Sequence, residues 1–248
     1  MLNILIRQRP DQTEHIHDNR YKMIEYRKSS IFNLQSSIPR RLALVFFLLL
    51  IGTSIESPAQ TWHRVKWVND GDTVVLTTGE RVRYIGINAP EIDHENQKAQ
   101  PQGYQARAFN KKLVMSQRIR FEYDQERTDR YGRTLAYVYL EDGSFLNLRL
   151  LQAGLAFYLY LKPNLKYSSM LLQAQRKAME SKKGLWHNWR EAPGKYIGNR
   201  SSRRFHLASC PHAARIKSKN KVNFRRKWDA FHQGYAPARK CIKEFWSY

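Results

Sequence analysis

Short stretches of alternating apolar and polar residues follow one another after residue 61, and a period of two is typical of β-strands with one buried face. Turn signals separate these stretches: Asp70-Gly71 and Thr78-Gly79 favour tight turns, and Pro90 ends the third stretch. The pattern therefore predicts strands at residues 62–68, 73–76, 81–87, 118–123 and 135–140.

Three other stretches place apolar residues three or four positions apart, which is the helical period. We expect helices at residues 104–115, 146–155 and 169–182. Short strands with a few helices interleaved and following them are typical of a small closed barrel with helices packed on it. The predicted fold class is therefore α+β.

Residues 1–37 are polar and show neither period, so we predict that they are disordered. An alternative is that translation starts at Met23 and that residues 1–22 are a wrongly assigned leader. This alternative arises because a signal peptide is normally about 15 to 30 residues long.

Residues 38–59 have the pattern of a signal peptide. Arginines precede a short apolar run at residues 42–51, and Ser57-Pro58-Ala59 follows it. We expect cleavage after Ala59 and export to the periplasm or out of the cell. A membrane-spanning helix needs about 20 apolar residues, so a permanent anchor is the alternative, and this segment would then be the chain's one contact with the membrane.

The 248 residues include 43 Lys and Arg against 21 Asp and Glu, a formal net charge of +22. Such an excess favours a polyanionic partner, with solubility or attraction to a membrane surface as alternatives. Two cysteines are too few for a disulfide-rich scaffold. The length fits one substantial domain at residues 60–189 and a smaller basic module at residues 190–248.

Carboxylates and arginines gather around the predicted turns. Asp70 and Asp72 share one turn, Arg83 lies in the next long strand, Glu91 follows that strand, and Arg133 belongs to a later loop. Phosphodiester hydrolysis needs this set of groups: oxygen ligands for a hard cation, a base for water, and guanidinium donors for phosphate charge. Taken singly, each residue also fits a hairpin turn or a surface ion pair.

A series of motifs runs through about residues 62–186. They are D-G-D-T at residues 70–73, R-x-x-x-x-x-x-P-E at 83–91, R-T-D-x-Y-G-R-x-L-A-Y at 127–137, L-x-x-G-L-A at 151–156 and K-P-N at 162–164. In this order the motifs resemble the staphylococcal nuclease-like, or thermonuclease, family. The resemblance implies an OB-fold, a five-stranded β-barrel with three helices, and a calcium-dependent endonuclease acting on DNA and RNA with little sugar specificity.

The resemblance also implies roles for single residues. Asp72 and Asn88 would bind Ca²⁺, and Glu91 would be the general base or position the attacking water. Arg83 and Arg133 would hold the scissile phosphate and stabilise the five-coordinate transition state.

Two positions depart from the family pattern, since this chain has Asn88 in place of a calcium-binding aspartate and Ala89 in place of a threonine. The amide oxygen of Asn88 can still bind Ca²⁺ but brings no charge, and calcium affinity depends on ligand charge. We therefore expect weaker calcium binding in an active nuclease.

Three tyrosines, Tyr131, Tyr158 and Tyr160, fall where the family lines its nucleotide pocket. An aromatic face there would stack a base and contribute about 1 to 3 kcal/mol. The alternative is that these rings only pack in the fold.

Residues 190–248 carry fifteen Lys and Arg against three Asp and Glu, with aromatic residues between them, which is typical of a nucleic-acid-binding module.

Residues 190–248 also resemble a degenerate Ada-like metal-binding domain, with F-H-x-x-x-C at 205–210 and G-Y-x-P-x-x-x-C at 234–241. Ala238 replaces one cysteine of that family's usual pair. The remaining His206, Cys210 and Cys241, with His212 as a stand-in, would bind Zn²⁺; the alternative is a disulfide between the two cysteines.

Together these patterns predict an exported Ca²⁺-dependent hydrolase, a phosphodiesterase that cleaves DNA and RNA as a monomer and uses no small-molecule cofactor. The alternatives are a non-catalytic OB-fold module that binds nucleic acid and a membrane-tethered nuclease.

Overall fold

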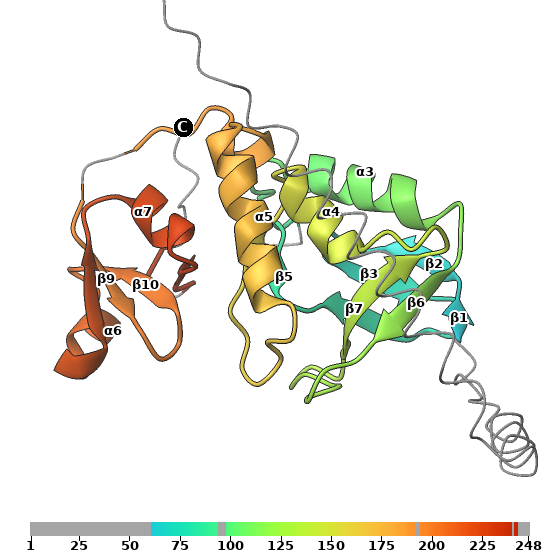
Figure 1. Ribbon diagram of the computed structural model, residues 1–248, viewed down its shortest axis with the longest axis horizontal. Helices are drawn as coiled ribbons and strands as arrows, with labels where there is room; N and C mark the ends of the chain where they lie inside the picture. Colours follow the sequence, from blue (N-terminus) through green and yellow to red (C-terminus); the bar gives the residue numbers. More distant parts are fainter. Residues whose placement is uncertain (1–60, 94–97, 192–193, 240, 243–248) are drawn as a thin grey trace, which may run out of the picture. The chain divides into compact units, whose positions relative to one another are not determined.

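The computed structural model describes residues 61–93, 98–191, 194–239 and 241–242 (Figure 1). They belong to one compact unit that begins at Gln60. The predictions for residues 1–37 and 38–59 lie outside the described residues and stay predictions. Within the described part of the chain, no helix is both long and apolar enough to cross a membrane.

The predicted strands are all present. They form a six-stranded sheet in the order β1-β6-β7-β4-β3-β2, with β4 and β7 in parallel and the other neighbours antiparallel. The third predicted strand is divided, because the chain turns at Gly86, which has a φ of +77°. Its second part, β5 (Ile87–Asn88), pairs separately with β8 (Phe157–Tyr158). The strands of the large sheet are β1 (Trp62–His63), β2 (Val65–Val68), β3 (Thr73–Leu76), β4 (Arg81–Tyr84), β6 (Ile119–Glu122) and β7 (Thr134–Leu140).

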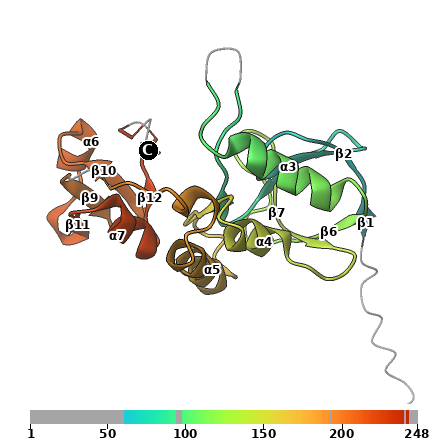
Figure 2. The same cartoon turned by 90° about the horizontal axis from the view of Figure 1, so that it is seen from above.

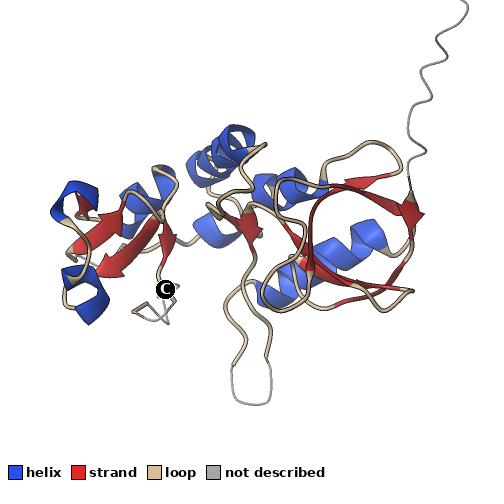
Figure 3. Cartoon of the chain, turned by 90° about the horizontal axis from the view of Figure 1, so that it is seen from below, coloured by secondary structure: helices blue, strands red, loops and turns tan. Residues whose placement is uncertain are grey.

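A closed five-stranded barrel is not seen: the large sheet is open and has six strands. The first predicted strand divides at Arg64, so that β1 pairs with β6 while β2 pairs with β3. The two ends of the sheet are therefore adjacent in the sequence, and Figure 3 shows the strands curving around a common interior. Fully buried apolar side chains fill that interior, among them Val74, Leu76, Val82, Ala136 and Val138.

Three helices form where the sequence predicts them: α3 (Gly103–Val114) and α4 (Leu146–Gln152), which pack on the large sheet, and α5 (Ser168–Glu180), which packs on α4 and β8. The helix α3 buries Ala106, Asn110 and Val114, which are four residues apart and share one face. This helix packs against β2 (Figure 2), and α4 packs against α5. A short 3-10 turn, η1 (Gly184–Trp186), follows α5.

The C-terminal module has a four-stranded sheet in the order β11-β9-β10-β12. Its apolar core is continuous with the preceding region, because Phe157, Met179 and Trp186 belong to the same buried cluster as Phe205 and Phe231 of the module. The module therefore does not bury its core alone. Its elements are β9 (Tyr196–Asn199), β10 (Arg204–Leu207), α6 (Pro211–Ala214), η2 (Ser218–Asn220), β11 (Lys221–Phe224), α7 (Lys227–His232) and β12 (Ala236–Pro237).

Candidate active site

The turn that joins β2 to β3 is fixed by its own polar groups and by its neighbours. The Asp70 carboxylate accepts a hydrogen bond from the Asp72 backbone N–H at 2.9 Å, and Asn110 of α3 donates to the Asp70 carbonyl at 3.2 Å. A Cβ on Gly71 would lie 2.5 Å from the Cβ of Ala89, so this turn can approach β5 only with glycine at its centre. The packing therefore directs Asp72 toward β4 and β5.

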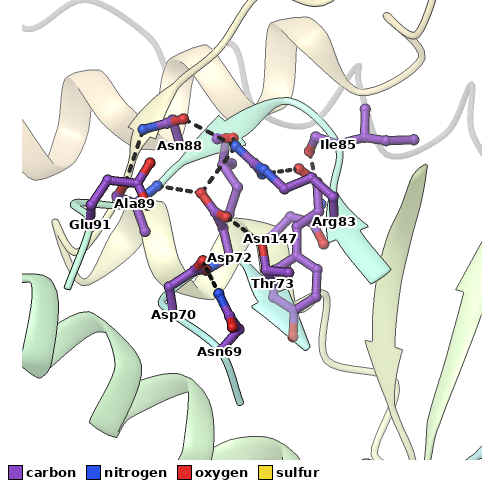
Figure 4. Close-up of polar contacts among 12 residues, drawn as sticks. Asn69, Asp70, Asp72, Thr73, Arg83, Ile85, Asn88, Ala89, Glu91 and Asn147 are labelled. Carbon is purple, nitrogen blue, oxygen red and sulfur yellow. Dashed lines mark hydrogen bonds and ion pairs between the residues drawn. The ribbon is translucent and has the colours of Figure 1, made fainter. Parts of the chain in front are cut away.

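The Asp72 carboxylate is buried at the centre of this site, with 5% of the residue exposed (Figure 4). Its Oδ2 accepts a hydrogen bond from the Ala89 N–H at 2.6 Å and lies 3.0 Å from Nη2 of Arg83. Burial raises the pKa of Asp72 to about 7; Arg83 opposes this shift, and the carboxylates of Asp70 and Glu91 add to it. A cation beside Asp72 would stabilise its ionised form.

Arg83 is 7% exposed and connects β4 to β5. Its guanidinium donates to the carbonyl oxygens of Tyr84 at 2.6 Å and Ile87 at 2.8 Å, and to Oδ1 of Asn88 at 3.1 Å. Asp72 and Asn88 therefore present oxygen atoms to the same Arg83 nitrogen, and one cation could reach both oxygens.

Glu91 lies at the edge of the site, after Pro90. Its backbone exchanges hydrogen bonds with Gln100, and a Cβ on Gly103 would be 2.4 Å from the Glu91 carbonyl oxygen, so the start of α3 packs tightly against it. The Glu91 carboxylate accepts a hydrogen bond at 2.8 Å from Arg239, a residue of the C-terminal module that the sequence did not indicate.

The oxygen groups of Asp70, Asp72, Asn88 and Glu91 are the kind of ligand that Ca²⁺ prefers. Three of these side chains are carboxylates, but within the described residues their oxygen atoms do not all lie within 4.8 Å of one another. The fit to a hard cation therefore rests on the type of donor and on the oxygens of Asp72 and Asn88, the predicted ligands, which share one Arg83 nitrogen.

Arg133 is not joined to this cluster by any contact within the described residues. Its guanidinium binds the Asp129 carboxylate, with Nη2 to Oδ2 at 2.7 Å. Burial acts to raise the pKa of Asp129, but the bonds from Arg133 outweigh it and lower that pKa. Gly132, with a φ of +71°, lets the loop turn back. The loop lies beside β4, because Thr134 pairs with Val82.

The three tyrosines differ in exposure. Tyr131 is 58% exposed, with the guanidinium carbons of Arg130 and Arg133 at 4.8 and 5.5 Å from its ring centroid, so a base can stack only where these groups leave the ring open. Tyr160 is half-buried, with the ammonium of Lys162 over its ring. Tyr158 is 4% exposed and its hydroxyl bonds to Ser168, so this ring packs in the core and offers no stacking face.

In the C-terminal module a disulfide joins Cys210 to Cys241, with their Cα atoms 5.9 Å apart. His206 Nδ1 lies 3.2 Å from the Cys241 sulfur, so the three groups predicted for zinc do come together. Burial lowers the pKa of His206, with a smaller effect from His212. Disulfide and zinc are mutually exclusive, since a disulfide leaves no thiolate. Zinc binding and the Ada-like resemblance stay predictions.

A buried acid–guanidinium pair with further carboxylates beside it supplies groups that phosphodiester cleavage uses. Residues 81–188 match the family model for staphylococcal nuclease homologues. The chain is 45% identical over 127 residues to a thermonuclease of Staphylococcus intermedius, which is 50% of this chain and 75% of that protein. It is 40% identical over 129 residues to a thermonuclease of Staphylococcus hyicus (51% and 76%), and 39% identical over 122 residues to endonuclease YncB of Bacillus subtilis (47% and 57%). The chain belongs to the staphylococcal nuclease homologue family, and this membership implies the OB-fold.

Proposed function

We propose that this chain is an exported, Ca²⁺-dependent endonuclease that hydrolyses DNA and RNA with little sugar specificity. The chain is a nuclease, a hydrolase of phosphodiester bonds, as its family and its relatives named thermonuclease and endonuclease support. The observation that supports calcium-dependent cleavage is the buried pair of Asp72 and Arg83, with Glu91 at the edge of the same cluster.

Asp72 and Asn88 would hold Ca²⁺, and the Asp70 carboxylate would fix the turn by accepting a hydrogen bond from the Asp72 backbone N–H. When bound, the ion supplies positive charge beside the phosphate and makes a nearby water more acidic. Arg83 fixes both ligands, because it donates to Asn88 and pairs with Asp72.

Glu91 is suited to the base role because hydrogen bonds with Gln100 fix its backbone while its carboxylate reaches the edge of the site. It accepts one proton from water as the water oxygen bonds to phosphorus. The bond from phosphorus to the leaving sugar oxygen then breaks, and that oxygen takes a proton from solvent.

Broad substrate choice follows from what the site contacts. The charged groups of the cluster are suited to bind phosphate oxygens, which DNA and RNA share, and phosphate contacts carry no sequence information. The net charge of +22 favours both polyanions. The exposed ring of Tyr131 provides a stacking surface that any base can use.

Export is supported by the sequence of residues 38–59 and by the disulfide, which persists in oxidising compartments. If the segment is not cleaved, the nuclease is membrane-tethered. Fractionation of cells into soluble and membrane material distinguishes these two outcomes.

The test is digestion of plasmid DNA and of RNA with calcium, with magnesium and with a chelator. We expect cleavage of both substrates with calcium and none with the chelator. Asp72→Asn should abolish the calcium response, whereas Asp142→Asn, a matched change in an exposed turn, should preserve it. Nucleic-acid binding without calcium-stimulated cleavage by the unmodified protein would instead support a non-catalytic binding module.

A further inference from the structure

Arg239 of the C-terminal module reaches the nuclease site. Its Nη2 donates to Oε1 of Glu91 at 2.8 Å and to Oδ1 of Asn88 at 3.1 Å, across 148 and 151 positions of sequence. Its side chain remains 74% exposed. One guanidinium therefore touches both the predicted base and a predicted calcium ligand while still facing solvent.

The module holds the segment that carries Arg239 on both sides. Before it, β12 pairs in parallel with β10, and the Ala238 N–H donates to the Phe205 carbonyl at 2.9 Å. After it, the Cys241 N–H donates back to Ala238 at 2.9 Å, and Cys241 is joined to Cys210. Arg239 is thus presented from a short anchored turn, and its position is a property of the module.

The two arginines predicted to hold the phosphate are already engaged. Arg83 is buried and bonded to Asp72 and Asn88, and Arg133 is paired with Asp129 within its own loop. Arg239 differs, because its partner Glu91 is at the edge of the site and an exposed ion pair is weak. A phosphate entering the site can displace it readily.

Arg204 of β10 adds a second guanidinium from the module. It is half-buried, and within the described residues its guanidinium makes no hydrogen bond or ion pair. Arg204 pairs with Ala236 of β12, the strand that leads to Arg239, so the two arginines come from adjacent parts of the module. Burial, with smaller effects from the positive charges of Arg239 and Arg83, lowers the pKa of Arg204 to about 10. A gathering of like charges of this kind is stabilised by an anion.

We propose that Arg239, supplied by the C-terminal module, is a phosphate-binding residue of the nuclease site, with Arg204 beside it. When nucleic acid enters, the Arg239 guanidinium moves from Glu91 to a non-bridging phosphate oxygen. This exchange places positive charge on the phosphate and leaves Glu91 free to accept the proton of water. The inference rests on the proposed nuclease function.

The kinetic test compares calcium-dependent cleavage of a DNA oligonucleotide by the full chain and its variants. Arg239→Gln should lower kcat/KM by about tenfold to a hundredfold, with a fall in kcat, because a donor to the charge that develops on phosphate is lost. Arg239→Lys should recover part of the rate, since it keeps the charge but not the bidentate geometry. Arg215→Gln, a matched change at the exposed end of α6, should alter the rate less than about twofold.

A binding test needs no cleavage and separates this inference from the proposed function. With chelator present, the slope of log affinity for DNA against log salt should become shallower by about 0.9 for Arg239→Gln, because one phosphate contact is lost. If the unmodified chain does not cleave DNA but the slope changes, the proposed function fails and the phosphate contact stands. An unchanged slope and rate would show that Arg239 does not contact phosphate. A faster Arg239→Gln enzyme would show that Arg239 instead blocks Glu91, and would also overturn the inference.

Discussion

Replacing Asn88 by aspartate would place a carboxylate at a predicted calcium ligand. The Asn88 Oδ1 accepts hydrogen bonds from Arg83 and Arg239, both at 3.1 Å, and its Nδ2 donates to the Ala89 carbonyl at 2.9 Å. Asn88→Asp keeps the first two bonds and turns them into ion pairs, but it loses the third because a carboxylate has no N–H to donate.

The effects on stability and on calcium binding have opposite signs. Losing the bond to Ala89 in a site that is 8% exposed should lower the free energy of unfolding of the metal-free protein by about 1 to 2 kcal/mol. A new unit charge beside a divalent ion gains several kcal/mol at an effective dielectric constant of about 20. Most of this is offset because Arg83 and Arg239 already pair with the carboxylate before the ion arrives. We expect the free energy of calcium binding to become more favourable by a net value of about 1.4 kcal/mol, which is a tenfold lower Kd for Ca²⁺.

Titration calorimetry with Ca²⁺ measures the Kd, and thermal unfolding with and without Ca²⁺ measures stability. Asn223→Asp, the same change on the exposed face of β11, controls for the altered net charge. A folded Asn88→Asp variant whose calcium affinity equals that of the unmodified protein would refute the ligand role of residue 88.

Three further predictions follow from the same site and from the module. Burial raises the pKa of Asp72 to about 7, so the metal-free fold gains stability in acid, and this stability is lost as the pH rises through 7. Calcium affinity, measured by calorimetry, should change in the opposite direction and rise by up to about tenfold per pH unit below 7. Gly71→Ala would place a Cβ 2.5 Å from that of Ala89, so denaturant titration should show a loss of about 1 to 3 kcal/mol, and an unchanged midpoint would contradict this packing. The Cys210–Cys241 disulfide, at a sequence separation of 31, should stabilise the fold by about 3 to 4 kcal/mol; a reductant should lower the unfolding temperature, whereas free thiols with bound zinc in the purified protein would establish the zinc alternative.

The five strands and three helices predicted between residues 62 and 182 could be identified because the burial of apolar side chains imposes a period of two or of about 3.6 on the sequence. The pattern did not predict β8 or the elements of the C-terminal module. The same pattern did not show that the first strand divides at Arg64, because the division depends on which neighbour each half pairs with. The closed five-stranded barrel was therefore predicted where an open six-stranded sheet is found.

Within the candidate site, Asp72 and Arg83 could be assigned because short turns bring β3 and β4 together. The pairing of Arg133 with Asp129 had a local signal, since the two residues are four positions apart around Gly132. The burial of Tyr158 had no signal in the sequence, because β8 is only two residues long and so short a strand has no pattern that shows which side chain faces the core.

Arg239 had no signal at all in the sequence. It lies 148 positions from Glu91, in a basic module where arginine and lysine are frequent. The two parts of the chain are brought together by their shared core and by hydrogen bonds from Gln175 and Arg176 of α5 to α7. Contacts of this range depend on the packing of whole elements, which periodicity does not encode.

The cluster around Asp72 and Glu91 is the proposed site of phosphodiester cleavage. Its most direct test is the rate of plasmid cleavage by Glu91→Gln in saturating calcium, with DNA affinity measured in chelator and Glu180→Gln, an exposed change at the end of α5, as the control. We predict that Glu91→Gln cleaves at least about a hundredfold more slowly while its DNA affinity is retained, because general-base catalysis contributes about 10² to 10⁴. A Glu91→Gln variant that cleaves at the unmodified rate would contradict the assignment of this site.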